Sequence, residues 1–480
     1  MNKKTKVIAT YGPACEKPNV LPNLIKAGTD LIRINASHNA DPEKLKQIVT
    51  KVRQASKKLE KRVGIFLDLQ GPKIRVGTFK KEKITLKSNS TVSIYTKDLV
   101  GDEKQFSVDY PYFCKDVKVD DPIFIDDGKI KGIVQSVSDD HVICKITTGG
   151  VVSSNKGVNL PFTKLSMSAF TKKDEKDALT AIKVKCDYIA LSFVSSAYDV
   201  ISFRRFLDEN GGEGFKIIAK IERQQAVDNL VEIVQQADAV MVARGDLGVE
   251  IGNKRVPRIQ KQIIQTCNKY IKPVIVATQM LESMINSLVA TRAEVSDIAN
   301  AIYDHCDAVM LSAETAVGID PVNAVTVMAE ICEEADNHLV QVRKDEITIT
   351  KRIFAFHTTA TSFCRAADQI AEENSAKVIM AFTSSGNTPL IASKLNSLFP
   401  IIAPTDSEEV CNQLCLFRGV IPIMMPKLFS EIYRWTDMIS LAVKQSEKQG
   451  YVEKGDCVVV TAGIPIGRSN GINSIRIINV

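Results

Sequence analysis

The stretch of sequence that decides the fold runs from residue 217 to residue 248 and reads IIAKIERQQAVDNLVEIVQQADAVMVARGDLG. Two apolar strand patterns are separated here by a helix-length segment, with Lys220 and Glu222 at the end of the first and Asp246 after the second. Because the carboxyl ends of neighbouring parallel strands meet at one edge, the two carboxylates can share one Mg²⁺, with the lysine over the same small substrate. This arrangement suits a phosphoryl group and a developing enolate, although each charge taken alone could be a solvated strand end.

Apolar strand patterns alternate with helical patterns on both sides of this stretch. Eight strands are predicted, at Val7–Thr10, Leu31–Asn35, Val63–Leu69, Tyr188–Phe193, Ile217–Ile221, Ala239–Val242, Val274–Ala277 and Ala308–Leu311. Helical patterns fill the gaps between them, at Pro42–Leu59, Lys172–Lys183, Pro257–Tyr270 and Arg292–Tyr303. Eight strand-then-helix units predict an α/β fold, a (β/α)8 TIM barrel with its site at the C-terminal strand ends.

The third of these units is interrupted between Pro72 and Pro161 by short alternating strand patterns. Turn signals separate the strands at residues 87–89, 126–128 and 148–150. The pattern predicts a small β-barrel inserted at the active-site face, where a lid belongs.

A third region follows Asn337. Strand patterns at Lys377–Phe382, Ile401–Ala403, Val420–Ile423 and Cys457–Ala462 alternate there with helices, which predicts a separate C-terminal α/β domain. The expected division is therefore 1–71 and 162–337 for the barrel, 72–161 for the lid, and 338–480 for the C-terminal domain.

Composition narrows the function classes. The 62 basic and 56 acidic residues give a formal charge of +6, but they are interspersed, so they form no nucleic-acid footprint and favour a small anionic substrate. The 11 cysteines are scattered without a CxxC pair, which is typical of reduced cytosolic thiols. A strand pattern begins almost at the first residue, and no apolar run reaches about 18 residues. We therefore expect a cytoplasmic protein without a signal peptide or membrane contact.

The chain resembles the pyruvate kinase family in a series of motifs that occur in order along most of its length. They are Thr10–Pro13, Arg33–His38, Leu67–Arg75, Asn155–Pro161, Lys220–Arg223, Ala243–Gly248, Thr278–Met284, Thr291–Asp297 and Leu311–Thr315. A single match could arise by chance, whereas their number and order make the resemblance specific. It implies a barrel domain, a mobile lid, a C-terminal domain and a homotetramer.

The resemblance also implies the reaction and its central residues. Phosphate would pass from phosphoenolpyruvate to ADP, giving ATP and an enolate that is then protonated to pyruvate. Glu222 and Asp246 would hold Mg²⁺, with Mn²⁺ as a substitute, and Lys220 would stabilise charge on the transferring group and the enolate oxygen. Arg33 would bind phosphoryl oxygens with its planar fork. Phosphoryl transfer leaves little covalent work for the protein, so positioning and charge neutralisation must carry the rate.

The substrate carboxylate would be bound by the backbone N–H groups of Gly245 and Asp246, with the hydroxyl of Thr278 completing the pocket. Two candidates remain for protonation of the enolate, Thr278 and Ser312. Either would act through water, because neither hydroxyl is acidic enough to be an ordinary general acid.

Nucleotide binding would fall at the junction of barrel and lid. Arg75 and Lys156 flank the insertion, so both could move onto the ADP phosphates when the lid closes. Pro13, Asn35 and His38 lie where the family places the nucleotide, although His38 could instead be a buried core histidine.

The chain departs from the commoner family pattern at the monovalent-cation position. Many members have Thr-Lys-Gly-Pro-Glu after the third-strand aspartate and need K⁺, whereas this chain has Leu-Gln-Gly-Pro-Lys at residues 69–73. The positions equivalent to the K⁺ ligands are Asn35, Ser37, Asp68 and Leu69. Because a fixed ammonium can supply the charge that K⁺ brings, we expect Lys73 to replace K⁺ and no K⁺ requirement. The alternative is a solvated loop lysine.

The C-terminal domain contains a loop rich in hydroxyls between a strand and a helix, formed by Thr383, Ser384, Ser385, Gly386, Asn387 and Thr388. A similar loop in the family holds a phosphate of a sugar-phosphate activator, and the alternative here is plain helix capping. Arg468 could supply a second, cationic contact. We therefore expect a sugar-phosphate or nucleotide effector, whose identity the sequence leaves open.

Two other functions fit part of the pattern. Another Mg²⁺-dependent barrel that forms a pyruvate enolate, such as a carbon–carbon lyase, would not need a lid with Arg75 and Lys156. A catalytically silent, sugar-phosphate-binding regulator would be expected to have lost Lys220, Glu222 or Asp246, and all three are present.

Overall fold

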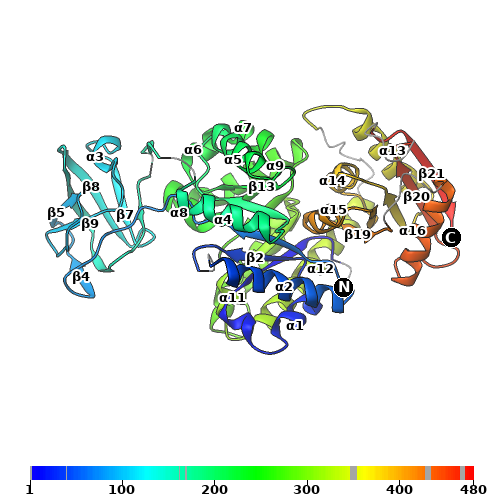
Figure 1. The fold of residues 1–480 in the computed structure, drawn as a ribbon, viewed down its shortest axis with the longest axis horizontal. Helices are drawn as coiled ribbons and strands as arrows, with labels where there is room; N and C mark the ends of the chain where they lie inside the picture. Colours follow the sequence, from blue (N-terminus) through cyan, green and yellow to red (C-terminus); the bar gives the residue numbers. More distant parts are fainter. Residues whose placement is uncertain are drawn as a thin grey trace.

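The computed structural model describes residues 3–38, 41–161, 163–167, 170–345, 354–426, 434–464 and 471–480. Three parts follow one another along the long axis of the molecule (Figure 1): the all-β insertion on the left, the barrel in the middle and the C-terminal α/β part on the right. Among the described residues, no helix combines the length and the apolar character needed to cross a membrane.

Eight parallel strands form the closed barrel that the sequence predicted, in the order β1-β16-β15-β14-β13-β12-β3-β2. Their bounds are β1 Lys6–Tyr11, β2 Leu31–Asn35, β3 Gly64–Asp68, β12 Tyr188–Leu191, β13 Lys216–Ile221, β14 Ala239–Ala243, β15 Val274–Ala277 and β16 Ala308–Leu311. The ring closes where Ala9 of β1 pairs with Leu311 of β16. Nearly all strand residues are buried, as expected for parallel strands covered by helices on the outside.

Helices surround the barrel, and polar caps fix where several of them begin. They include α1 Val20–Ala27, α2 Pro42–Lys58, α4 Lys172–Lys183, α5 Ala197–Glu209, α7 Leu230–Gln236, α9 Val256–Lys269, α10 Arg292–Tyr303 and α12 Pro321–Asp345. Thr171 before α4 and Thr291 before α10 each form a capping box with the acidic residue three positions later. The four predicted helices agree with α2, α4, α9 and α10 to within one residue at each end.

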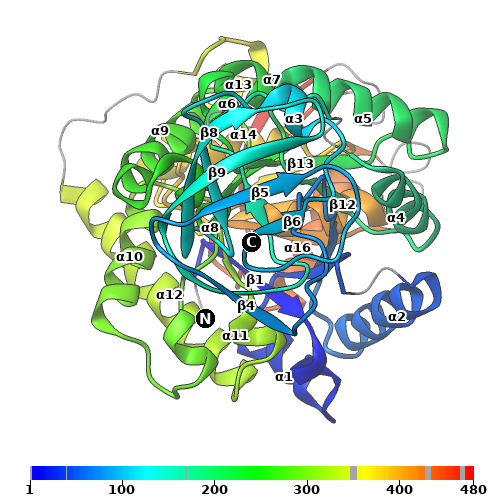
Figure 2. The same ribbon diagram turned by 90° about the vertical axis from the view of Figure 1, so that its left-hand side faces the viewer.

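The insertion between β3 and α4 is a curled sheet in front of the barrel end (Figure 2). Six strands run in the order β11-β7-β8-β9-β5-β6, and a two-stranded ribbon pairs β10 with β4. Their bounds are β4 Lys83–Leu86, β5 Thr91–Tyr95, β6 Gln105–Ser107, β7 Pro122–Ile125, β8 Ile130–Val137, β9 His141–Thr148, β10 Gly150–Ser153 and β11 Val158–Asn159, with α3 at Phe113–Asp116. The lid is thus a curled sheet, a half-barrel, at the place where the sequence predicted a small inserted β-barrel. The predicted turns connect its strands, and positive φ angles at Asn89, Asp126 and Asp127 explain their residue types.

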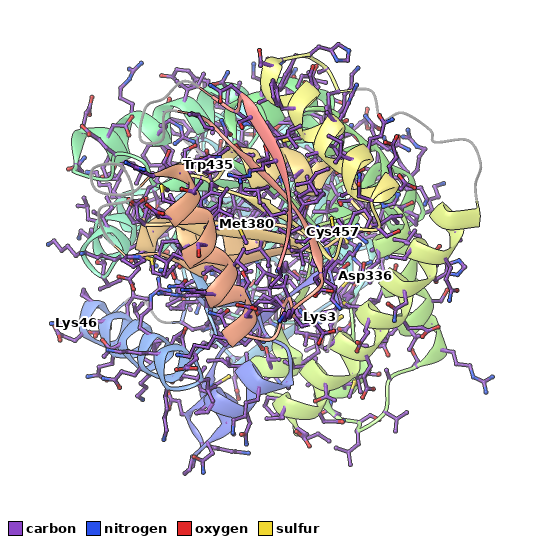
Figure 3. All side chains as sticks on the ribbon, turned by 90° about the vertical axis from the view of Figure 1, so that its right-hand side faces the viewer. Lys3, Lys46, Asp336, Met380, Trp435 and Cys457 are labelled. Atoms are coloured by element: carbon purple, nitrogen blue, oxygen red, sulfur yellow. The ribbon has the colours of Figure 1, made fainter. Side chains whose placement is uncertain are left out.

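The C-terminal part is a five-stranded sheet in the order β19-β18-β17-β20-β21. Its elements are α13 Thr359–Glu373, β17 Val378–Ala381, α14 Asn387–Lys394, β18 Ile401–Thr405, α15 Glu408–Gln413, β19 Val420–Met424, α16 Trp435–Lys448, β20 Cys457–Ala462 and β21 Ser474–Asn479. β21 alone is antiparallel to its neighbour. Figure 3 views this part end-on, with Trp435 at the start of α16 and Cys457 at the start of β20.

This part docks against the end of the barrel where the strands begin. Lys394 of α14 forms a buried ion pair with Asp307, which directly precedes β16. The hydroxyl of Tyr188, at the start of β12, donates to the Gln413 carbonyl over 2.7 Å, and Arg418 pairs with Asp336 at 2.5 Å. The opposite end of the barrel, where the strands finish, is thus left to the lid and the candidate site.

Candidate active site

Lys220 occupies the centre of the strand ends, on β13. Its ammonium lies 2.9 Å from Glu222 Oε1 and 3.2 Å from Asp68 Oδ1, and donates to the Ser192 hydroxyl over 2.7 Å. Burial alone would lower the pKa of Lys220, but Asp68 and then Glu222 outweigh it, so the pKa is raised above its usual range. The lysine is therefore a permanent positive charge held in one position.

Asp68 links Lys220 to the second predicted cation, Arg33. Asp68 ends β3, and its Oδ2 accepts from Arg33 Nε at 2.7 Å while its Oδ1 faces Lys220. Burial raises the pKa of Asp68, but Lys220 and Arg33 together bring it below the ordinary value. Arg33 also donates to the Thr10 hydroxyl over 3.2 Å. The planar guanidinium is thereby fixed at the end of β2.

Glu222 and Asp246 can hold a divalent cation. Glu222 is 1% exposed, and its Oε2 accepts the Phe193 backbone N–H at 2.6 Å. Burial raises the pKa of Glu222, Lys220 lowers it, and the nearby Asp246 raises it further, with a net upward shift. In the part of the chain that the structure describes, buried Glu222 Oε1 receives no well-directed hydrogen bond despite its ion pair. A buried oxygen in this condition, beside a second carboxylate, fits Mg²⁺.

Asp246 lies in the first turn of α8, Arg244–Ile251, next to the pocket predicted for the substrate carboxylate. The Gly245 N–H donates to Thr278 Oγ1 over 2.8 Å, and that hydroxyl donates to the Ala277 carbonyl over 2.6 Å. The predicted donors Gly245 and Thr278 are therefore brought together. In this structure they bind one another.

Thr278 and Gln279 have φ angles of +69° and +53°, a left-handed conformation that costs free energy for residues with a side chain. Buried Arg244 holds them in place, because its guanidinium donates to the Thr278 carbonyl over 2.7 Å and to the Gln279 carbonyl over 2.9 Å. The same guanidinium pairs with Asp297 at 2.6 Å. Arg244 thus aims Thr278 at the site.

Ser312 directly follows β16, and its backbone N–H donates to Glu314 over 2.7 Å. Its hydroxyl oxygen is buried and has no hydrogen-bond partner among the described residues. A buried hydroxyl in this condition can bind a water molecule, as either candidate proton donor requires.

Two of the predicted nucleotide residues, Arg75 and Lys156, lie on the paired segments 73–76 and 155–158 that join the lid to the barrel, here called the hinge. Arg75 pairs through its backbone with Gly157, and its side chain donates to the Asn155 carbonyl over 3.3 Å. Lys156 is ion-paired with Asp126 of the lid at 2.9 Å. On the barrel side, Pro13 starts a short helix, Asn35 Oδ1 accepts the Ser37 N–H at 3.0 Å, and His38 is exposed, which excludes a buried core histidine.

Lys73 also belongs to the hinge. It is half-buried, and its side chain extends along Gly157 so closely that a Cβ there would lie 2.9 Å from Lys73 Cε. Leu69 is 2% exposed. Lys73 is therefore not a fully solvated loop lysine.

Two family models match most of the chain. Residues 2–325 match the model "Pyruvate kinase, barrel domain", and residues 361–478 match "Pyruvate kinase, alpha/beta domain". The chain belongs to the pyruvate kinase family.

Individual pyruvate kinases are similar over nearly their full length. The enzyme of Clostridium acetobutylicum is 40% identical over 476 residues, which cover 99% of each chain. That of Thermotoga maritima is 38% identical over 478 residues, covering 100% of both. A crystal structure of a pyruvate kinase from Cryptosporidium parvum superimposes with a TM-score of 0.91 at 34% identity, covering 100% of this chain and 96% of that one. Pyruvate kinases use phosphoenolpyruvate and ADP, and the family generally depends on Mg²⁺.

The roles of three residues at this site were not predicted from the sequence. Asp68 was expected only as a monovalent-cation position, yet it bridges Lys220 and Arg33. Ser192 and Arg244 were not singled out at all. The signal for Arg244 was present, since it stands in one recognised motif and its partner Asp297 in another.

The loop predicted to bind an effector, residues 383–388, begins shortly after β17 and runs into the first residues of α14. The Gly386 N–H donates to the Thr383 hydroxyl over 2.8 Å, and Gly386 has a φ of +86°. No side chain caps α14, and Ser384 and Ser385 are exposed. Arg468 lies outside the described residues.

Proposed function

We propose that the cluster around Lys220 carries the phosphoryl transfer between phosphoenolpyruvate and ADP. The observation that supports it is one buried ammonium held between Asp68, Glu222 and Ser192. Negative charge that develops on the transferring group and the enolate oxygen would be stabilised by the Lys220 ammonium, which is already in position and need not reorganise. Arg33, held by Asp68 and Thr10, would bind the phosphoryl oxygens with its planar guanidinium.

Mg²⁺ would be held by Glu222 and Asp246, and Mn²⁺ can substitute because it accepts the same oxygen ligands. When bound, the ion supplies Lewis-acid stabilisation of phosphoryl and enolate oxygens. The Phe193 N–H would keep Glu222 oriented toward it.

The pocket beside α8 would take the substrate carboxylate. We infer that the carboxylate replaces the contact between Gly245 and Thr278, because an anion is the stronger acceptor for a backbone N–H at a helix start. Thr278 and Ser312 both remain candidates to hold the water that protonates the enolate. The buried hydroxyl of Ser312 favours it as a water ligand.

ADP would bind between barrel and lid, near Pro13, Asn35 and His38, with Arg75 and Lys156 on its phosphates. Lys156 would exchange its ion pair with Asp126 for the phosphates, and Asp126 would keep its second cationic partner, Lys129.

We propose that the enzyme needs no K⁺. Lys73 at the hinge would supply the charge that the ion brings to Asn35, Ser37, Asp68 and Leu69 in related enzymes. Its half-buried position along Gly157 supports this proposal.

Regulation would act through the effector loop. Its exposed hydroxyls and uncapped helix start support an anion cradle for a sugar phosphate or a nucleotide, in a homotetramer. All eleven cysteines are free, nine of them buried, which supports a reducing, cytoplasmic location.

The central experiment is a coupled assay with phosphoenolpyruvate, ADP and Mg²⁺. We expect ATP and pyruvate in equal amounts, loss of activity with a chelator, and recovery with Mg²⁺ or Mn²⁺. Repeating it at low phosphoenolpyruvate with sugar mono- and bisphosphates and nucleotides tests the effector loop. If none changes the half-saturating phosphoenolpyruvate concentration, residues 383–388 form only a helix start.

A further inference from the structure

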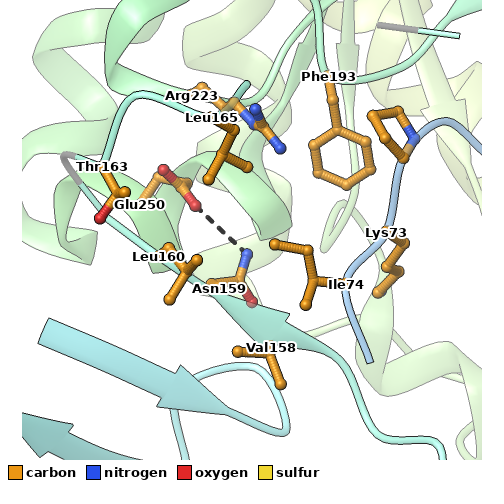
Figure 4. A pocket seen from close by; sticks show the side chains of 11 residues that line it. Lys73, Ile74, Val158, Asn159, Leu160, Thr163, Leu165, Phe193, Arg223 and Glu250 are labelled. Atoms are coloured by element: carbon orange, nitrogen blue, oxygen red, sulfur yellow. Dashed lines mark hydrogen bonds between the residues drawn. The ribbon is translucent and has the colours of Figure 1, made fainter. Parts of the chain in front are cut away.

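A small buried cavity lies where the lid joins the barrel (Figure 4). Its volume is about 20 Å³, which is room for one water molecule but not for a substrate. The lid and hinge contribute Lys73, Ile74, Val158, Asn159 and Leu160 to its wall, and the barrel contributes Phe193, Arg223 and Glu250. Neither catalysis nor nucleotide binding, as described above, uses Asn159, Arg223 or Glu250.

Two opposite charges of the barrel face this cavity. Glu250 is 7% exposed, and its Oε1 accepts a hydrogen bond of 3.4 Å from Asn159 Nδ2, drawn as the dashed line in Figure 4. The Arg223 guanidinium lies 5.0 Å from the centre of the Phe193 ring. Glu250 and Arg223 thus line the same cavity. Asn159 stands on β11, the last strand of the lid before the chain returns to the barrel.

Both barrel residues are joined to the proposed metal ligands. Glu250 follows Asp246 by one helical turn within α8. Arg223 directly follows Glu222, and the Phe193 residue on which Arg223 stacks donates its backbone N–H to Glu222 Oε2 over 2.6 Å. A displacement of Glu250 is therefore passed to Asp246 through one turn of α8, and a displacement of Arg223 is passed to Glu222 through the peptide bond between them.

We propose that Asn159, Glu250 and Arg223 form a latch that couples the position of the lid to the two metal-binding carboxylates. They are positioning residues, and the assignment rests on Glu222 and Asp246 holding the metal. The 3.4 Å bond is near the long limit for a hydrogen bond, so a small movement of β11 makes or breaks it. Lid position and metal affinity then depend on each other, because any coupling between two equilibria is reciprocal.

The test alters the donor on the lid. Asn159→Ala removes the bond, and we expect the half-saturating ADP and Mg²⁺ concentrations to rise about fivefold while kcat changes less than about twofold. Asn159→Asp places two carboxylates together, and the rise should be about tenfold or more. Adding Glu250→Gln to Asn159→Asp restores a donor and an acceptor with their roles exchanged, and should return both values to within about twofold of wild type.

Metal binding is also measured without turnover, from the electron paramagnetic resonance signal of free Mn²⁺ in the presence of phosphoenolpyruvate. We expect Asn159→Ala to weaken Mn²⁺ binding and to speed amide exchange in residues 157–160. The matched control is Thr147→Val, whose hydroxyl bonds only to the Lys131 carbonyl within the lid. It should behave as wild type.

The outcomes separate the two hypotheses. If the wild type binds Mn²⁺ and turns over but the Asn159 variants lose only thermal stability, or the double variant fails to recover, the latch is refuted. If Mn²⁺ binds the wild type but Glu222→Gln and Asp246→Asn do not weaken it, the proposed metal ligands are wrong.

Discussion

Replacing Lys220 with methionine tests the role proposed for the buried ammonium. Methionine has a similar length and no charge. The substitution removes a cation that lies within 3.2 Å of both Asp68 and Glu222. The ground-state contacts proposed for the substrate, from Arg33 and the start of α8, remain in place. We therefore expect phosphoenolpyruvate to bind with little change.

The expected loss in turnover follows from Coulomb's law. With an effective dielectric constant of about 20, an ammonium about 3 Å from a unit negative charge stabilises it by roughly 5 kcal/mol. If about half a charge develops on the enolate oxygen in the transition state, the variant loses roughly 2.5 to 3 kcal/mol. This corresponds to a decrease in kcat on the order of 10².

The assay measures kcat and KM through coupled oxidation of NADH, and phosphoenolpyruvate binding by calorimetry with Mg²⁺ present. Lys220→Arg is the matched variant, since it keeps the charge but changes its shape. Thermal unfolding checks the fold, because Glu222 loses its cation. A Lys220→Met enzyme with a raised KM and an unchanged kcat would refute the reasoning and make Lys220 a binding residue only.

Three further predictions concern charges elsewhere. Wild-type turnover in Na⁺ or tetramethylammonium salts should be near that in K⁺ at constant ionic strength. The double variant Leu69→Thr, Lys73→Glu should acquire a K⁺ dependence. Collapse of wild-type turnover without K⁺ would contradict this prediction. Asp126→Asn should lower the half-saturating ADP concentration by a factor of about two to five, because Lys156 then has no ion pair with residue 126 to give up when it binds the phosphates. An increase in that concentration would show that Lys156 does not exchange Asp126 for the phosphates. Lys394→Met should lower the free energy of unfolding by about 3–5 kcal/mol in urea denaturation, because it leaves a buried carboxylate before β16 without its cation, and an unchanged midpoint would count against it.

The barrel was predictable because each of its strands is a short apolar run followed by a helical pattern. The strand from 216 to 221 shows this, since five of its six residues are buried and the predicted start differs by one residue. The curl of the lid was not predictable in the same way. The alternation of apolar and polar residues predicts which face of strands β7 to β9 is buried. Whether a sheet closes into a barrel depends instead on pairings between strands that are distant in the sequence.

In the site, too, some residues could be singled out from the sequence and others could not. Lys220, Glu222 and Asp246 were found because they stand close together in sequence at two strand ends. The bridge from Asp68 to Lys220 joins residues 152 positions apart, and it exists only because the ring of strands brings the end of β3 near that of β13. Arg244 was missed for a related reason. Arg244 and Asp297 both stand in recognised motifs, but nothing local in the sequence shows that Arg244 holds a left-handed turn in another loop.

Asp68 also gives the proposed independence from K⁺ a structural rationale. Its two oxygens already face Arg33 and Lys220, so this carboxylate has its counter-charges without a monovalent ion. What K⁺ would add is positive charge toward the phosphates at the open side of the site. A glutamate at position 73 would oppose that charge, whereas Lys73, which extends along Gly157, would supply it. The exchange of Glu for Lys changes the local charge by two elementary units, more than one bound K⁺ contributes, so K⁺ binding there would be disfavoured by repulsion as well as redundant.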